Sequence, residues 1–207
     1  MTDPATRSAT ALRATVIGGG AVVTAAIPLA FPVDGGPTDL DTAMSTRIEE
    51  TVSPTLGQWL VAPSNTPVVL VALIAACAWF ALHRRWWAAV TMLVVPEVAV
   101  AINTWVLKPL WARELHDYLA YPSGHTVHMV AVATTFACLV RDLRARCVIG
   151  ALTVLALLAI VVGMVERGYH HPTDVLGGAA AGVSLAVALC WISQMLRTRE
   201  RRAGSSR

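Results

Sequence analysis

The stretch YLAYPSGHTVHMVAVATTFACLV, residues 118 to 140, places a short polar cluster directly before an apolar run long enough to enter a membrane. The cluster consists of Pro122, Ser123, Gly124 and His125. A second stretch, ERGYHHPTDVLGGAAAGVSLAVALC at residues 166 to 190, repeats this arrangement with His170, His171 and Asp174. Two titratable clusters, each at the mouth of a hydrophobic helix, predict one shared site.

The composition indicates an integral membrane protein. Of the 207 residues, 56% are hydrophobic and 14% charged, and the mean hydropathy is +0.60, whereas a soluble domain has about 25% charged residues. A bilayer core needs about 20 apolar residues per helix. The sequence therefore predicts a single all-α domain, residues 1–207, built as a bundle of six transmembrane helices. These are expected at about residues 13–32, 65–82, 87–107, 123–140, 147–165 and 174–195.

The basic residues predict the orientation of this bundle. Twelve of the sixteen lie near the N-terminus, in the turns at residues 84–85 and 141–146, or on the tail at residues 197–207. These places share one side of a six-helix bundle, and the positive-inside rule makes that side cytoplasmic. Both termini are then cytoplasmic. The basic tail is interpreted as facing lipid headgroups, and no nucleic-acid partner is expected.

The opposite, outer side carries most of the acidic residues and only four basic ones. These four are Arg47, Lys108, Arg113 and Arg167. Because cations are disfavoured on this side, they invite a functional explanation. The outer loop, residues 33–64, contains Met44, Ile48 and Val52 at a spacing of four, which allows a short amphipathic helix on the outer surface.

The PSGH cluster has the chemistry of an anion site. Ser123 is a natural N-cap residue, so the free amides of Gly124 and His125 point out of the positive end of a helix. Lys108 and Arg113, on the preceding segment, add the cations that a phosphate group requires. The outer end of this helix is therefore expected to bind phosphate.

The second cluster adds a nucleophile. Pro172 suits the first turn of a helix and places Asp174 near its start. If that turn already includes His170, the two side chains share a helix face, and the carboxylate can hold one imidazole nitrogen while the other attacks phosphorus. His125 would then donate a proton to the leaving oxygen and later accept one from water.

With these residues the sequence resembles the type 2 phosphatidic acid phosphatase superfamily of membrane lipid phosphatases, whose fold is shared by vanadium haloperoxidases. The resemblance rests on PSGH, on HHPTDVLGG and on the lysine that ends the preceding helix. It implies His170 as a nucleophile that forms a phosphohistidine, Asp174 as its orienting group and His125 as the acid. It requires no metal and no other cofactor. The phosphate-binding residues are then Lys108, Ser123 and Gly124.

Two motif positions depart from the family pattern. The first motif usually has Arg-Pro seven residues after the lysine, where this chain has Leu115 and His116. The third usually has Ser-Arg six to seven residues before its histidine, where this chain has Gly163 and Met164. Two phosphate-binding arginines are therefore missing from their usual places.

Arg113 and Arg167 are expected to refill the phosphate pocket. Arg113 lies two residues early, and Arg167 lies three residues late, a shift that changes the facing of a helical residue by only about 60°. His116 is a further candidate ligand in the space left by arginine. Weak or altered catalysis and a non-catalytic relative that only binds lipid phosphate remain the alternatives.

Glu97 and His128 are polar residues inside predicted helices. A charge in the middle of a membrane helix is costly and often functional. Glu97 lies about 16 Å from Lys108 along a straight helix, too far to touch the same phosphate. We interpret it as a hydrogen-bonded packing residue or as part of a polar inner cavity, and keep it among the candidate site residues. His128 is expected to pack between helices.

The expected function is hydrolysis of a lipid phosphomonoester or pyrophosphate at the outer leaflet of a bacterial cytoplasmic membrane. Natural substrates of this kind are polyprenyl phosphate or pyrophosphate, phosphatidic acid and phosphatidylglycerol phosphate. The expected partners are the lipid substrate and the bilayer, and the sequence leaves the oligomeric state open. A small transporter is disfavoured because the chain has no repeated half, and a haloperoxidase because it is mostly membrane helix.

Overall fold

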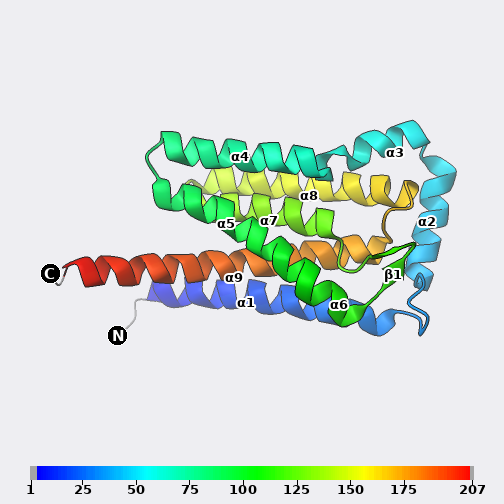
Figure 1. Ribbon diagram of the computed structural model, residues 1–207, viewed down its shortest axis with the longest axis horizontal. Helices are drawn as coiled ribbons and strands as arrows, with labels where there is room; N and C mark the ends of the chain where they lie inside the picture. The colour runs from blue at the N-terminus through cyan, green and yellow to red at the C-terminus, as the bar shows by residue number, and fades with distance from the viewer. Residues whose placement is uncertain (1–3, 206–207) are drawn as a thin grey trace.

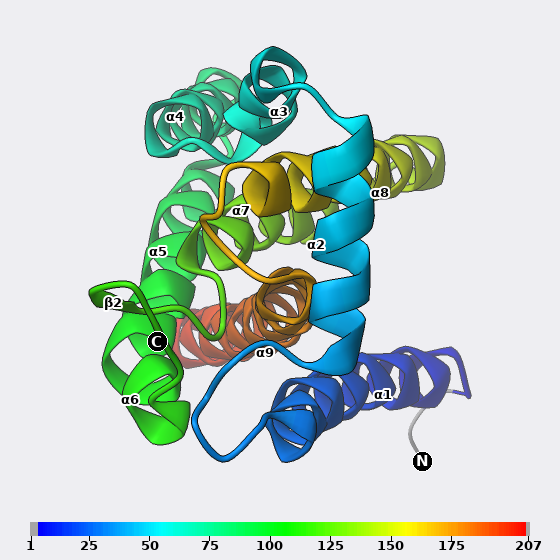
Figure 2. The same ribbon diagram turned by 90° about the vertical axis from the view of Figure 1, so that its right-hand side faces the viewer.

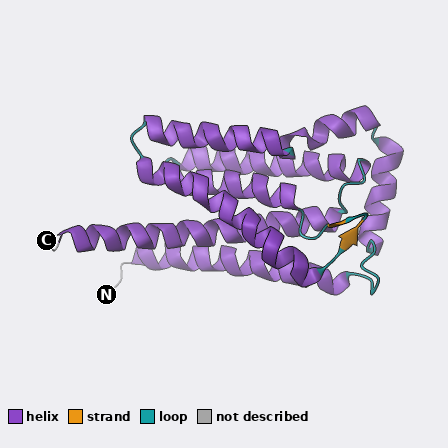
Figure 3. Cartoon of the chain, viewed as in Figure 1, coloured by secondary structure: helices purple, strands orange, loops and turns teal. Residues whose placement is uncertain are grey.

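The computed structural model describes residues 4–205, which are almost entirely helical apart from one short hairpin (Figure 3). The long helices are α1 (Pro4–Ala26), α4 (Thr66–Leu82), α5 (Trp86–Ile102), α7 (Gly124–Leu139), α8 (Leu143–Glu166) and α9 (Pro172–Ser205). The short helical elements are η1 (Ile27–Ala30), α2 (Asp39–Thr51), α3 (Pro54–Val61), η2 (Ala62–Ser64), the π-helical turn η3 (Asn103–Leu107) and α6 (Lys108–Trp111). The antiparallel hairpin pairs β1 (Glu114–Leu115) with β2 (Tyr118–Leu119).

The molecule is a membrane-type helical bundle. Five stretches of the described residues are long and apolar enough to cross a bilayer: Arg7–Ala30, Pro54–Leu82, Trp86–Trp111, Leu143–Glu166 and Pro172–Ala203. The sixth expected crossing coincides with α7, which is apolar but only 16 residues long, shorter than the roughly 20 residues of a full span. Leucines 152, 155 and 158 of α8 are exposed, as lipid-facing side chains are. Six crossings remain a prediction.

The two ends of the bundle differ in character. α1 begins and α9 ends at one end, together with the α4–α5 turn (Figure 1). That turn carries Arg84 and Arg85, two of the basic residues used above to predict the orientation. The opposite end carries α2, α3 and the hairpin (Figure 1). The site described below lies at this second end, and which end faces the cytoplasm stays a prediction.

A helix, α2, lies where the sequence allowed a short amphipathic helix, and its amphipathic character stays a prediction. It runs across the end of the bundle from α1 to α3, in front of the ends of α8 and α9 (Figure 2). Thr38 and Asp41 form a capping box at its start, which fixes this helix N-terminus. Asp41 is fully buried, so α2 turns a carboxylate toward the bundle.

Close packing of α7 against α9 joins the two halves of the site. A Cβ atom built at Gly178 would lie 2.7 Å from the carbonyl oxygen of Ser123, and one at Gly182 would lie 3.0 Å from that of Val127. The GxxxG spacing of these glycines is typical of close contacts between membrane helices. The backbone N–H of Ser123 also donates a hydrogen bond of 3.0 Å to the carbonyl of Asp174. The beginnings of α7 and α9 are therefore held in register.

Candidate active site

A cavity of about 820 Å³ opens between α4, α5, α7 and the hairpin. Most of the side chains that line it are polar. They are Ser64, Thr66, Leu70, Glu97, Val100, Lys108, Tyr118, Gly124, His125, His128, Tyr169 and His170. Lys108, Gly124, His125 and His170 were each predicted as site residues, and the fold brings them to this one cavity.

Lys108 reaches the cavity from the end of a distorted helix. The π-helical turn Asn103–Leu107 separates it from α5, and such turns shift the facing of the residues that follow. The ammonium group donates a hydrogen bond to the carbonyl of Leu119 in the hairpin. A Cβ atom at Gly124 would lie 3.8 Å from the Lys108 side chain. The cation therefore lies beside the N-terminus of α7.

The N-terminus of α7 supplies amide donors to the same space. Gly124 and His125 begin the helix, and the N–H groups of a first turn have no partner within the helix. Ser123 is the N-cap, as predicted, and its Oγ accepts a hydrogen bond of 3.5 Å from the amide of Thr126. Its side chain is fully buried and is not among the residues that line the cavity. The structure thus gives the Ser123 side chain a capping role.

His170 and Asp174 lie together, although not on one helix face. His170 precedes α9, which starts at Pro172. Asp174 turns back over this N-terminus, and its Oδ2 accepts a hydrogen bond of 2.9 Å from the amide of His171. The same oxygen lies 3.6 Å from His170 Nδ1. The imidazole thus meets a carboxylate on its Nδ1 side, and its Nε2 is the atom available for chemistry.

Arg113 does not lie in the phosphate cavity, which corrects the expectation that it refills it. Its guanidinium is 1% exposed and donates hydrogen bonds of 2.8 Å to Asp174 Oδ1 and 3.0 Å to Asp41 Oδ2. Nη1 also donates to Thr173 Oγ1 at 2.8 Å, and Nε and Nη2 donate to two glycine carbonyls at 3.2 and 2.8 Å. The ring of Phe31 lies 3.9 Å from its central carbon. All three guanidinium nitrogens are thus occupied beneath the site.

Asp41 completes this buried network from α2. Its Oδ1 accepts a hydrogen bond of 2.9 Å from the amide of Thr173, and its Oδ2 accepts one from Thr173 Oγ1 at 2.9 Å. Burial by itself raises the pKa of the Asp41 carboxyl, but the hydrogen bonds from Thr173, Thr38 and Arg113 together outweigh burial and hold this pKa below its usual value. The carboxylates of Asp41 and Asp174 thus share the guanidinium of Arg113, and Asp174 also lies beside His170.

Arg167 and His116 lie outside the cavity, at its rim. The guanidinium carbon of Arg167 lies 5.7 Å from the ring centre of Tyr169, a cavity residue, and the arginine is exposed. His116 is exposed in the hairpin turn at a φ of 56° and stacks on Tyr118 with ring centres 6.3 Å apart. Neither lines the cavity. A role for either in phosphate binding stays a prediction.

Two tyrosines that the sequence did not single out form the outer wall of the cavity. Tyr118 meets the His170 ring edge to face with centres 5.9 Å apart, and its hydroxyl donates a hydrogen bond to the carbonyl of Tyr169. Burial, followed by the nearby carboxylates of Asp174 and Asp117, raises the pKa of Tyr118. Its hydroxyl therefore remains a neutral donor that fixes the wall beside His170.

Glu97 lines the same cavity as Lys108 and His125, so it is part of a polar inner cavity as well as a hydrogen-bonded residue. Its Oε1 lies 3.1 Å from Nε2 of His128, and its side chain is 48% exposed. His128 was expected only to pack between helices. Packing of α5 against α7 brings the two residues together, and such a contact between helices cannot be read from spacing along one helix.

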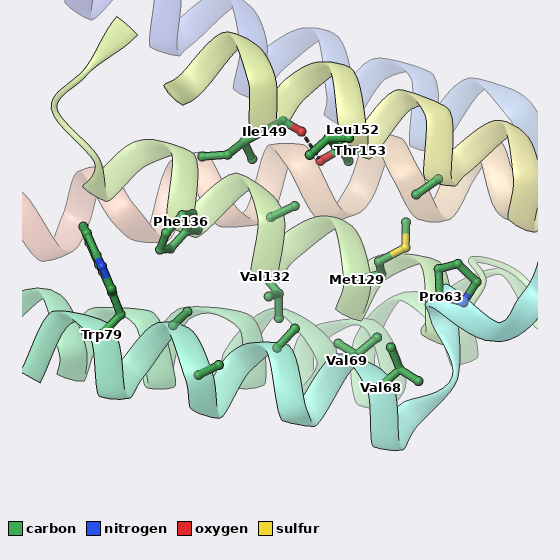
Figure 4. Close-up of a pocket in the computed structure, with 15 residues that line it drawn as sticks. Pro63, Val68, Val69, Trp79, Met129, Val132, Phe136, Ile149, Leu152 and Thr153 are labelled. Carbon is green, nitrogen blue, oxygen red and sulfur yellow. Dashed lines mark hydrogen bonds between the residues drawn. The ribbon is translucent and has the colours of Figure 1, made fainter. Parts of the chain in front are cut away.

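A second cavity has a different character. It has a volume of about 530 Å³ and lies between α4, α7 and α8 (Figure 4). Trp79, Met129, Phe136 and other apolar side chains form its wall, and the hydroxyl of Thr153 is turned to the carbonyl of Ile149 at 2.7 Å. None of its lining residues is titratable. The chemistry of the molecule is therefore assigned to the polar cavity.

One family model matches part of the chain. Residues 103–198 match the model of the PAP2 superfamily. This part of the chain is similar to the PAP2 superfamily. The matched segment begins at Asn103 in the π-helical turn and includes Lys108, His125, His170 and Asp174. Searches of curated proteins and of solved structures found no significant match.

PAP2 superfamily members generally hydrolyse phosphoesters, which supports a phosphatase-like function for the chain.

Asp41 lies outside the matched segment, and sequence reasoning did not identify it as a partner of the site. Its capping-box spacing with Thr38 indicates only a helix start. Its partner Arg113 is 72 residues away, and no sequence spacing connects the two.

Proposed function

We propose that the chain is a membrane lipid phosphatase that hydrolyses a lipid phosphomonoester or pyrophosphate through a phosphohistidine at His170. The observation that carries this proposal is the convergence on one cavity of Lys108, the N-terminus of α7 and a histidine backed by a carboxylate. A cation and a helix N-terminus bind a phosphoryl group, and an oriented imidazole attacks it.

In the first chemical step, His170 Nε2 forms a bond to phosphorus while the bond from phosphorus to the lipid oxygen breaks. His125 gives its proton to that oxygen, which leaves as the lipid alcohol or, from a pyrophosphate, as the lipid monophosphate. Lys108 and the amides of Gly124 and His125 stabilise the phosphoryl oxygens. Asp174 holds the Nδ1 side of His170.

In the second step, His125 takes a proton from water, and the resulting hydroxide attacks the phosphohistidine. The bond from nitrogen to phosphorus breaks, inorganic phosphate leaves, and His170 returns to its starting state. Both histidines line the cavity. Every bond change is completed by water and the lipid phosphate alone.

A site within a bundle of membrane-type helices supports a lipid as the substrate. The lipid chain would leave the cavity past Leu70 and Val100, the apolar members of its lining on α4 and α5. Polyprenyl phosphate or pyrophosphate, phosphatidic acid and phosphatidylglycerol phosphate are the substrates proposed for a multi-pass protein whose site faces the outer side of a bacterial cytoplasmic membrane. Recycling of a carrier lipid for cell-envelope synthesis is the process that fits such a site.

One observation favours a second function, lipid-phosphate binding without catalysis. Arg113 is fully engaged in the buried network, and Arg167 is at the rim. Lys108 is the one cationic lysine or arginine among the residues that line the cavity. A single cation and a helix N-terminus are enough to bind phosphate, whereas arginine often supplies much of the transition-state stabilisation in phosphoryl transfer.

Phosphate release by the purified protein in detergent with EDTA, measured across these lipids, tests the proposal. Wild type is expected to release phosphate, and His170→Ala is expected to abolish release. His83→Ala is the matched control, because His83 is exposed and bonds the carbonyl of Trp79 at the other end of the bundle. Arg167→Ala measures whether the rim arginine contributes.

Three results separate the two functions. Release that survives EDTA and is lost only with His170→Ala supports the phosphatase. Release that survives His170→Ala contradicts the histidine mechanism. If the folded wild type releases phosphate from none of the lipids but is stabilised by them against heat, the binding function replaces the catalytic one.

A further inference from the structure

Glu97 is a carboxyl group in a place where a membrane protein usually has none. It follows Pro96 in α5, its side chain is 48% exposed, and it lines the cavity of the proposed site. An ionisable group within a membrane helix is costly and normally marks a functional site. The mechanism proposed above does not use it.

Among the described residues, His128 is the hydrogen-bonding partner of Glu97. Nε2 of His128 meets Oε1 at 3.1 Å. The second oxygen of the carboxyl belongs to a half-exposed side chain in the cavity. One oxygen of the Glu97 carboxyl is therefore hydrogen-bonded to His128, and the other is available to a ligand.

The position of the pair relative to the reacting phosphate follows from α7. His128 is three residues after His125, which corresponds to about 4.5 Å along the helix axis. Residues at this spacing lie on the same helix face, and both line the cavity. The pair therefore lies one turn deeper than the histidine that acts on the leaving oxygen.

A lipid whose phosphate is bound beside His125 presents its first carbons about one helical turn deeper, at the level of His128 and Glu97. A carboxyl beside an imidazole can accept a hydrogen bond from a hydroxyl group and donate one to it. The same carboxyl disfavours the second phosphate of a pyrophosphate, because both groups are acidic. A bare hydrocarbon chain would leave the free side of the pair without a hydrogen-bonding partner. An unsatisfied polar group of this kind makes binding less favourable.

We propose that Glu97 and His128 form a specificity subsite for a hydroxyl group close to the phosphate of a lipid monophosphate. The assignment rests on the proposed function for the position of the phosphate and narrows its substrate class. Lipids of this class are glycerol-based or amino-alcohol-based monophosphates with a free hydroxyl. Lipids without the hydroxyl are expected to bind less tightly.

The test compares oleoyl lysophosphatidic acid with its deoxy counterpart, in which hydrogen replaces the free glycerol hydroxyl. Binding to the full chain in detergent is measured in a His170→Ala background, so that turnover does not interfere. The hydroxylated lipid is expected to bind about tenfold tighter, the amount typical of a hydrogen bond to an ionisable group. Glu97→Met should bring the affinity ratio to about one, and the conservative Glu97→Gln should give a value in between.

Glu49→Gln, an exposed position on α2, is the matched control and should keep the full ratio. Equal affinities for the two lipids in the parent protein, or a ratio that survives Glu97→Met, would overturn the subsite. If Glu97→Met does not fold, the parent ratio and the isosteric Glu97→Gln decide the question in the same way.

Phosphate release by the wild-type chain, measured in parallel, separates this inference from the function on which it rests. Selective binding without release from any lipid supports the subsite and contradicts the phosphatase. Release from both lipids at equal affinity contradicts the subsite and leaves the phosphatase standing.

Discussion

Lys108 is the only lysine of the chain, and no neighbouring cation can take over its proposed role at the phosphate. Arg113 is buried in another network and Arg167 lies at the rim. Lys108→Met is therefore expected to lower kcat/KM for a lipid phosphate by about 100-fold or more. Lys108→Arg should recover only part of this loss, because a planar guanidinium does not replace a compact ammonium.

Steady-state phosphate release measures both lysine variants. The control is Arg144→Met, an exposed cation at the start of α8, which should leave the activity unchanged. An activity for Lys108→Met within about twofold of the wild type, a difference of less than 0.5 kcal/mol, would remove Lys108 from the phosphate site.

The close approach of α7 to α9 can be tested by adding a methyl group at the contact. A Cβ atom at Gly178 would lie 2.7 Å from the Ser123 carbonyl and 3.0 Å from the Thr126 side chain. Gly178→Ala must push the two helices apart, and we expect a loss of about 2 kcal/mol of stability from this overpacking. Activity should fall as well, because Gly124 follows Ser123 directly.

Gly150 provides the matched comparison within α8. A Cβ atom there would have no neighbour within 4 Å. Gly150→Ala is expected to change the stability by less than about 1 kcal/mol and to favour the helix. Thermal unfolding in detergent compares the two variants, and equal midpoints would contradict the helix contact described here.

Asp41 connects α2 to Asp174, because both carboxylates bond the guanidinium of Arg113. The folded pKa of Asp41 lies below its ordinary value of 3.8. The stabilisation by the ionised carboxylate is therefore complete above the unfolded pKa and is lost as the pH falls through the folded pKa. Asp41→Asn should cost about 3 kcal/mol at neutral pH, because it breaks a buried ion pair, and should make the acid loss of stability shallower.

Unfolding midpoints between neutral and acid pH measure this effect. Asp39→Asn changes an exposed carboxylate of the same helix and should cost less than about 1 kcal/mol. If Asp41→Asn and wild type lose stability in parallel as the pH falls, Asp41 is not the group that couples α2 to the site.

The predicted orientation of the bundle determines which of its two ends a reagent can label from outside the cell. Glu49 lies on α2 at the end that carries the site, and Arg144 lies at the other end, where α1 begins and α9 ends (Figure 1). In a chain whose native cysteines are replaced by alanine, Glu49→Cys should react with a membrane-impermeant maleimide in intact cells. Arg144→Cys should react only after permeabilisation, and the reverse pattern would invert the proposed orientation.

The sequence predicted the parts of the molecule that depend on local rules. Apolar length predicted the long helices, and capping chemistry predicted the places of Ser123 and Pro172. Motif spacing predicted His125, His170 and Asp174 as site residues, and the fold brings these three residues close together, while their catalytic roles stay a prediction. The position of the Arg113 side chain in the buried network could not be predicted in this way. Its direction depends on a hairpin and on a carboxylate from α2, and such long-range contacts leave no periodic signal in the chain.

The same limit applies to Glu97. Its distance from Lys108 along a straight helix suggested separate environments, but the π-helical turn and the packing of α5 against α7 place both in one cavity. Helix distortions and crossing angles follow from tertiary packing. Residues of a site that lie on different helices are therefore recognised as neighbours only once the bundle is assembled.

The covalent intermediate decides whether this cavity performs the proposed chemistry. Wild-type protein would be mixed with a lipid monophosphate carrying radiolabelled phosphate, quenched in alkali within a single turnover, and digested for mass spectrometry. If His170 is the nucleophile, the label is expected on the peptide that contains His170, stable to alkali and lost in acid, and it is expected to be absent in His170→Ala. Phosphate release by wild type with the label absent from His170, or present on another residue, would contradict His170 as the nucleophile.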